Sequence, residues 1–297
     1  MSQLRRIWNR VEAAAARGLL LVVAAAPLPA VLGLARVAAW LAFLLWSRRR
    51  RIAVDNIRLA GIRADEAGAR ALALDSFRAF ATMVAETIVA RRRLTRDNWA
   101  EHVRLHLSAE AEALLRKPGQ GLIVASGHLG NWEVAARAIS MVKPVCVAYR
   151  PFNNPELDQV AHAAREGEHL RLVSRLEAHP LRFMRALAGG DVVALMIDQH
   201  ATRGRVAIRF FDHPAWATKS VAMLSLTTRM PLVVAFAIRT GPLRYEIHAA
   251  GPLEVARSGD REKDAAVITQ ALTAEVEKAV RQHPEQYLWG HRRWRQH

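Results

Sequence analysis

His128 and Glu133 lie five positions apart, directly after an apolar, partly β-branched run at 121–126. A run of this length predicts a buried strand, and Gly127 and Gly130 allow a tight turn from that strand into a helix. A neutral imidazole can accept the proton of a hydroxyl group, and a nearby carboxylate can fix its tautomer and stabilise the imidazolium. The segment therefore predicts a general base, His128, with Glu133 as its partner. The same spacing also fits a helix N-terminus at which Glu133 only complements the helix dipole.

Several other blocks accompany this pair along the chain. They are Tyr-Arg-Pro at 149–151, Asp-Gln at 198–199, Phe-Phe at 210–211 followed by Ala-Thr-Lys at 217–219, and Pro-Glu-Gln-Tyr-Leu-Trp-Gly-His-Arg-Arg-Trp at 284–294. In this order and at these separations, the blocks resemble those of the bacterial late lipid A acyltransferases. The resemblance extends from about Ile52 to Trp294 and includes the His-x4-Asp/Glu motif that this family shares with glycerolipid acyltransferases.

The resemblance implies a membrane-associated enzyme that transfers a fatty acyl chain from acyl carrier protein to a hydroxyl group of a lipid A precursor. It further implies direct attack of the hydroxyl on the thioester, with no cofactor, at the inner membrane and with the catalytic domain on the cytoplasmic side. Two alternatives remain open at this point. One is the same chemistry on a lysophospholipid or another glycolipid. The other is a non-catalytic membrane protein that binds anionic lipid through its arginines.

Four further residues are candidates for substrate binding. Arg150 follows an apolar run, and Arg165 lies where the resemblance suggests a functional arginine; both suit contact with a phosphate or a carbonyl group. Asp198 and Gln199 form a polar end to another apolar run. A metal site built from His128, Asp198 and His200 is conceivable from the residue types, but no local ligand spacing supports it, so we predict no metal.

Two segments depart from the family pattern. Asp212 follows the two aromatic residues where the family more often has glycine, and Thr-Arg-Met-Pro at 228–231 replaces a run like Thr-Gly-Ala-Pro. We expect these differences to affect the preference for the acyl chain or for the acceptor, and not the reaction.

The elements that must position these residues alternate along the chain. Apolar runs predict strands at 103–107, 122–126, 144–149, 170–173, 192–197, 206–211, 232–238 and 245–250. Periodic segments predict helices at 65–91, 109–117, 131–141, 155–166, 179–187, 216–228 and 264–281. This alternation predicts an α/β fold with a mostly parallel central sheet flanked by helices. His128, Arg150 and Asp198 would then lie at the carboxyl ends of strands, where such sheets place their sites.

The N-terminal 50 residues predict a membrane anchor that precedes an acyltransferase domain at 51–297. Residues 18–35 carry no charge but contain Pro27 and Pro29, and a second apolar run at 37–46 ends in four arginines at 48–51. The segment fits either one kinked span or two shorter helices in a re-entrant hairpin. The arginines favour a retained anchor with the following domain in the cytoplasm.

The overall charge narrows the class of partner. Lys and Arg number 43 against 27 Asp and Glu, a net charge of +16. Such an excess suits a polyanion: nucleic acid, an anionic membrane surface or an acidic protein. The resemblance implies a membrane, an acidic carrier protein and a phosphate-bearing glycolipid, with no nucleic acid. The single cysteine, Cys146, excludes an intrachain disulfide and lies in an apolar run where we expect it to serve packing.

Overall fold

The computed structural model describes residues 3–174, 180–255 and 257–294. The helices are α1 (Gln3–Ala25), α2 (Leu28–Leu45), α3 (Ser47–Leu59), α4 (Glu66–Arg93), α5 (Trp99–His102), α6 (Ala109–Arg116), α7 (Trp132–Ser140), α8 (Pro155–Arg165), α9 (Pro180–Ala188), α10 (Ser220–Thr228), α11 (Arg261–Gln282) and the 3-10 turn η1 (Pro284–Gln286). The strands are β1 (Val103–Leu107), β2 (Leu122–Ser126), β3 (Val145–Tyr149), β4 (Leu170–Ser174), β5 (Val192–Met196), β6 (Arg205–Phe210), β7 (His213–Thr218), β8 (Leu232–Gly241) and β9 (Arg244–Ala250).

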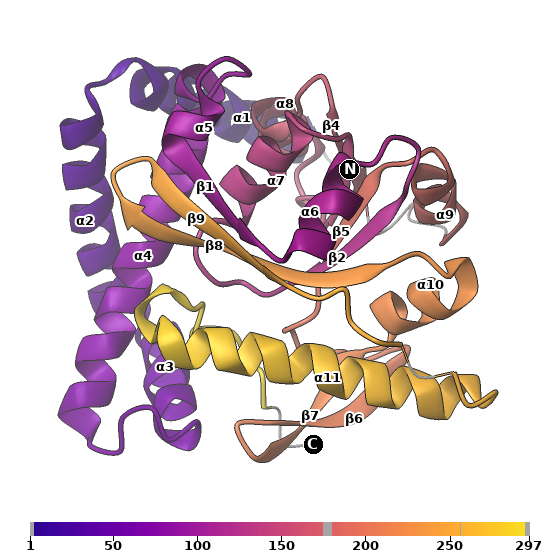
Figure 1. Ribbon diagram of the computed structural model, residues 1–297. Coiled ribbons are helices and arrows are strands. Elements are labelled where there is room, and N and C mark those ends of the chain that lie inside the picture. Colours follow the sequence, from indigo (N-terminus) through magenta and orange to yellow (C-terminus); the bar gives the residue numbers. More distant parts are fainter. Residues whose placement is uncertain (1–2, 175–179, 256, 295–297) are drawn as a thin grey trace.

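Seven strands form a central sheet in the order β1-β9-β8-β2-β5-β3-β4, shown in Figure 1. The pairs are parallel except for β8 and β9, which are antiparallel neighbours. This confirms the predicted α/β fold with a mostly parallel sheet. The predicted start of α9, His179, lies outside the described residues.

The two faces of the sheet are covered by different helices. Ile123, Ala125 and Val193 belong to the core under α9, α10 and α11, whereas Leu122 and Val192 belong to the core under α6. This is the alternation expected when successive side chains of a strand point to opposite faces. Cys146 is buried in the first of these cores, in agreement with a packing role, and burial raises the pKa of its thiol.

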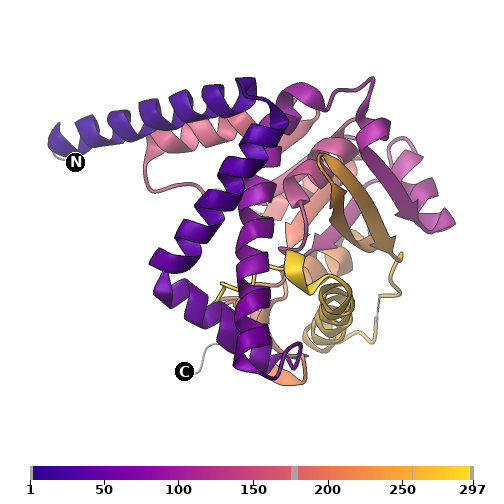
Figure 2. The same cartoon turned by 90° about the vertical axis from the view of Figure 1, so that its left-hand side faces the viewer.

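The N-terminal apolar segment forms two helices that meet at Ala26 and Pro27. Figure 2 shows α1 running beside α8 and α2 turning away from it to lie along α4. Pro27 ends the first helix and starts the second because its ring cannot continue a helix but suits a helix start. Among the described residues, α2 is the helix long and apolar enough to cross a membrane, and its Leu34, Trp40 and Leu45 side chains are exposed.

The helix predicted at 216–228 exists as α10, but its predicted start was wrong. Residues 216–218 belong to strand β7 and not to a helix, and β7 pairs with β6 in a separate two-stranded sheet. Phe211 and Asp212 join the two strands with φ angles of +50° and +61°. A two-residue hairpin turn of this kind usually contains Asn-Gly or Asp-Gly. Phe-Asp carries no such signal, so the hairpin was not recognisable from the sequence.

Candidate active site

The turn that carries His128 is held by a glycine and by the C-terminal segment. Gly130 has a φ of +66°, and a Cβ on it would lie 1.9 Å from the Ala237 carbonyl oxygen, so glycine is required there. The Gly130 N–H donates to the Gln286 carbonyl at 3.1 Å, and the Leu288 N–H donates to the His128 carbonyl at 3.0 Å. The C-terminal motif therefore braces the turn through backbone hydrogen bonds.

The parallel register of β2 and β5 brings Asp198 to His128. The last paired residues are Ser126 and Met196, and the Ile197 N–H donates to the Ser126 carbonyl at 2.9 Å. Two positions further along each chain segment, the Asp198 carboxylate lies 2.7 Å from His128 Nδ1 and accepts a 2.8 Å hydrogen bond from the His128 N–H. A carboxylate on Nδ1 leaves Nε2 as the proton-accepting nitrogen of the neutral imidazole.

The same pair sets the charge state of the site. Burial disfavours the charged imidazolium, but the charge and hydrogen bond of Asp198, together with the charge of Glu133, outweigh it and raise the pKa of His128 above 6.5. Burial also disfavours the Asp198 carboxylate, yet His128 and Arg293 hold its pKa down to about 2. Asp198 is therefore ionised at neutral pH, and the imidazole is more basic than an ordinary histidine.

Tyr287 and Arg293 support Asp198 from the C-terminal segment. Both are buried, and Tyr287 makes a side-chain hydrogen bond to Asp198. Burial raises the pKa of Tyr287 well above 10, so its hydroxyl remains a donor. Arg293 Nη1 donates to the carbonyls of Gln199 (3.1 Å) and Trp216 (2.7 Å). In the sequence, Tyr287 and Arg293 indicated a family and were not predicted as site residues. Their place in the C-terminal block was the available signal.

Glu133 is hydrogen-bonded to Arg165 and not to the imidazole. Asn131 caps α7 by accepting from the Val134 N–H at 3.0 Å, which puts Glu133 in the first helical turn. There its carboxylate accepts two hydrogen bonds from Arg165, at 2.8 Å from Nε and 2.7 Å from Nη2. The expected hydrogen-bond partner of His128 is thus replaced by Asp198, while Glu133 acts on the histidine through its charge.

The other two predicted residues also lie at this site. The Gln199 amide nitrogen is 3.3 Å from His128 Nε2. With Nδ1 directed to Asp198, Gln199 donates to the nitrogen that would accept a proton, so a substrate hydroxyl would have to displace it. Arg150 follows β3 and is exposed at the mouth of the cavity described below.

The side chains of His128, Asp198 and His200 do not form a metal-type group. The His200 N–H donates to His291 Nε2 at 3.3 Å. Over the described ranges, ligand atoms close enough to share an ion belong to His106, Glu246 and His248, at the outer edge where β1 pairs with β9.

An apolar cavity of about 290 Å³ begins at His128 and extends between α7 and the sheet. Glu133, Arg150 and Arg165 lie at its polar end with His128. Its walls come from β2, β3, β5, β8, β9 and from α6 and α7, and they reach the amino ends of the strands at Leu122. His128 follows Leu122 by six positions, which span at most about 20 Å at the rise of an extended chain. The arrangement joins a basic imidazole to a long, narrow hydrocarbon site.

Comparison with known proteins identifies the family. The family model of bacterial lipid A biosynthesis acyltransferases matches residues 4–296. The chain belongs to this family. It is 26% identical to the lipid A biosynthesis lauroyltransferase of Escherichia coli (strain K12), over 94% of this chain and 89% of the relative. It is also 24% identical to the lipid A biosynthesis palmitoleoyltransferase of the same organism, over 59% of this chain and 56% of the relative.

The family match confirms the resemblance to lipid A acyltransferases that the sequence blocks indicated. Within the lipid A acyltransferase fold, the blocks recognised in the sequence converge in space. His128 and Asp198 share hydrogen bonds, and the C-terminal block supplies the backbone brace, Tyr287 and Arg293. The His128 segment, the Asp-Gln block and the C-terminal block therefore meet at one candidate site.

Proposed function

We propose that this protein transfers a fatty acyl chain from acyl carrier protein to a hydroxyl group of a lipid A precursor at the inner membrane. Residues 1–50 would anchor it, and residues 51–297 would form the acyltransferase domain on the cytoplasmic side. Support comes from the family, from the apolar α2 with its exposed side chains, and from the net charge of +16, which suits an acidic carrier and a phosphate-bearing acceptor.

The proposed mechanism is direct transfer with His128 as the base. The acceptor hydroxyl displaces the Gln199 amide from Nε2, gives its proton to that nitrogen, and its oxygen attacks the thioester carbonyl carbon. Asp198 stabilises the imidazolium that forms. When the tetrahedral intermediate collapses, the C–O bond remains, the C–S bond breaks, and the thiolate of the carrier takes the proton from Nε2. The products are an ester and a free thiol, so no acyl-enzyme is needed.

The observation that carries this proposal is the apolar cavity that opens beside His128. Burying methylene groups contributes about 0.8 kcal/mol each, so a long acyl chain in the cavity would bind firmly and bring its thioester to the polar end. Ala194 faces this cavity between Val124 and Val147, its register partners on β2 and β3. This row crosses the path that we assign to the acyl chain.

We assign different roles to the two arginines at the cavity mouth. Arg165 binds both oxygens of Glu133 through the Nε–Nη2 edge of its guanidinium, so Arg165 positions that carboxylate. Arg150 is exposed and adds a positive charge where the donor thioester would enter. It is therefore our candidate for contact with the donor or with an acceptor phosphate.

The test is acyl transfer by the purified full-length protein, with an acyl carrier protein thioester as donor and a lipid A precursor as acceptor. Mass spectrometry should detect a glycolipid carrying one additional acyl chain. His128→Ala should lower the rate at least about 10²-fold, as expected for loss of a general base. His106→Ala, which removes an exposed histidine at the sheet edge, should behave as wild type.

Two results would contradict the proposal in different ways. Near-normal turnover by His128→Ala would remove the mechanism. Transfer by the wild-type protein to a lysophospholipid, with none to the lipid A precursor, would replace the acceptor and leave the base in place.

A further inference from the structure

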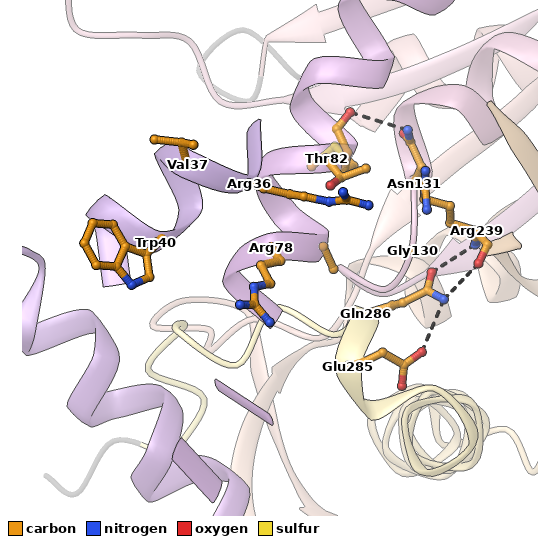
Figure 3. Close-up of a pocket in the computed structure, with 12 residues that line it drawn as sticks. Arg36, Val37, Trp40, Arg78, Thr82, Gly130, Asn131, Arg239, Glu285 and Gln286 are labelled. Atoms are coloured by element: carbon orange, nitrogen blue, oxygen red, sulfur yellow. Dashed lines mark hydrogen bonds between the residues drawn. The ribbon is translucent and has the colours of Figure 1, made fainter. Parts of the chain in front are cut away.

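A second, open cavity of about 520 Å³ lies between α2, α4 and the turn that precedes α7, and η1 borders it on another side (Figure 3). Three of its lining residues are arginines on separate elements: Arg36 on α2, Arg78 on α4 and Arg239 on β8. The mechanism proposed above uses none of these residues. The cavity therefore needs its own explanation.

The three guanidinium groups differ in how they are paired. Arg239 forks onto the buried Glu86, with both hydrogen bonds at 2.9 Å, and so is part of the frame. Arg78 Nη1 donates to Asp75 at 3.0 Å, an ion pair about half exposed on both sides. Within the described part of the chain, Arg36 has neither a hydrogen bond nor an ion pair. Figure 3 shows its side chain extending from α2 across the cavity toward Asn131.

Arg36 is the one charged residue among the 18 residues of α2. A cation in such a helix is costly in an apolar environment and is normally retained where it faces a cavity and pairs with an anion. Arg36 faces a cavity, but no carboxylate among the described residues pairs with it. Glu285, the acidic residue on the rim, accepts from the Gln286 amide at 3.3 Å instead. An anion from outside the chain would supply the partner that the described residues do not.

We propose that this cavity binds a phosphate group of a membrane lipid, with Arg36 as its principal contact and Arg78 as a second. Arginine suits this role because its planar guanidinium can donate two parallel hydrogen bonds to one phosphate. The Thr82 hydroxyl, on the same wall, offers a further donor. An anion would lie on the side of Arg36 and Arg78, away from the Glu285 carboxylate.

The position of the cavity favours the acceptor glycolipid as the lipid that carries this phosphate. This assignment rests on the function proposed above. Gly130 and Asn131 line this cavity, while His128 and Trp132 of the same turn line the apolar one. A glycolipid held by its phosphate at Arg36 would thus lie next to the imidazole. The second source is a phospholipid of the surrounding bilayer, since α2 also exposes Leu34 and Trp40.

The kinetic test compares Arg36→Gln and Arg36→Lys in the full-length enzyme with the matched control Arg17→Gln. Arg17 is an exposed arginine of α1 outside the cavity. With the phosphorylated acceptor, Arg36→Gln should raise the acceptor KM about tenfold, as for loss of a charged hydrogen bond, with kcat and donor KM little changed. Arg36→Lys should recover only part of this, and the control should match wild type. The difference between Arg36→Gln and wild type should vanish with an acceptor whose phosphates have been removed enzymatically.

A binding arm uses flotation with phosphatidylcholine vesicles, with and without phosphatidic acid. If the phosphate belongs to a bilayer lipid, Arg36→Gln should lose the binding that phosphatidic acid adds, while the acceptor KM stays unchanged. If Arg36→Gln matches Arg17→Gln in both arms, the proposal is overturned. Absence of any acyl transfer by the wild-type enzyme would refute the proposed function, and the vesicle arm would still decide whether Arg36 binds phosphate.

Discussion

The apolar cavity under α7 and the arginine-lined cavity beside α2 receive neighbouring residues of one turn, yet the first is walled mainly by apolar side chains of the sheet and the second by arginines from three separate elements. The first gains binding energy from apolar area removed from water, which has no direction and allows a chain to slide until it is filled. The second offers guanidinium groups, whose hydrogen bonds fix the position of an anion. The comparison suggests that the first cavity holds the donor by its acyl chain and the second holds the acceptor by a phosphate, so that the two substrates meet at His128.

The largest expected effect comes from removing the negative charge that holds His128, the residue at which the two substrates would meet. Asp198→Asn should lower kcat by about 10²–10⁴-fold, because the imidazolium loses its counterion and the Nδ1 tautomer is no longer fixed. It should also move the pH profile. Activity requires the neutral imidazole, so the rate rises with pH through the His128 pKa, which Asp198 raises. Loss of that charge should shift the rising limb of kcat/KM to lower pH.

The control for this shift is Glu133→Gln, which removes a charge that acts on His128 without a hydrogen bond. It should move the same limb in the same direction but by less than Asp198→Asn. A larger shift for Glu133→Gln would return Glu133 to the role of principal partner that the sequence alone suggested.

A pair of cavity-filling variants tests the comparison directly. Ala194→Phe narrows the apolar cavity and should shift the donor preference toward shorter acyl chains, with about tenfold loss on the longest chain that wild type uses. Ala79→Phe narrows the arginine-lined cavity and should raise the acceptor KM with no change in chain preference. The measurement is kcat/KM over a series of acyl carrier protein thioesters. Interchanged phenotypes would reverse the assignment of the two cavities.

The smallest expected effect concerns the β6–β7 turn, which is part of neither cavity. Asp212 has a φ of +61°, a conformation in which glycine carries no steric penalty, and the resembling family more often has glycine here. Asp212→Gly should change the free energy of unfolding by no more than about 1 kcal/mol, in the stabilising direction, or about 1–3 °C in Tm. Calorimetry measures this change. A shift in acyl-chain preference would show instead that this departure tunes specificity.

Strong local patterns explain why most of the fold could be predicted. The runs at 122–126 and 103–107 became β2 and β1 with the predicted bounds. Continuous apolar side chains suit β2, which is covered on both faces, and alternating apolar and polar side chains suit β1 at the edge of the sheet. Asn131 caps α7, as its residue type favours at a helix start. The β6–β7 hairpin was not predicted because its turn residues, Phe211 and Asp212, are not a pair that usually indicates such a turn.

The candidate site, too, was only partly predictable from the sequence. Sequence by itself determined that His128 sits on a glycine turn after a buried strand, because those properties depend on residues within a few positions. It also placed Asp198, Gln199 and Arg150 at strand ends, as local runs require. It paired His128 with Glu133 because the two residues have the spacing of the His-x4-Asp/Glu motif.

Tertiary structure alone decided the partners. The register of β2 on β5 brings Asp198 to His128 across 70 positions, and Glu133 turns to Arg165 across 32. The C-terminal block reaches the same turn through η1 and its neighbours. The cavities, too, arise only when helices pack on the sheet, since their walls come from many elements. Hydrogen bonds and cavities depend on distances in space, and these are set by strand register and helix packing rather than by spacing along the chain.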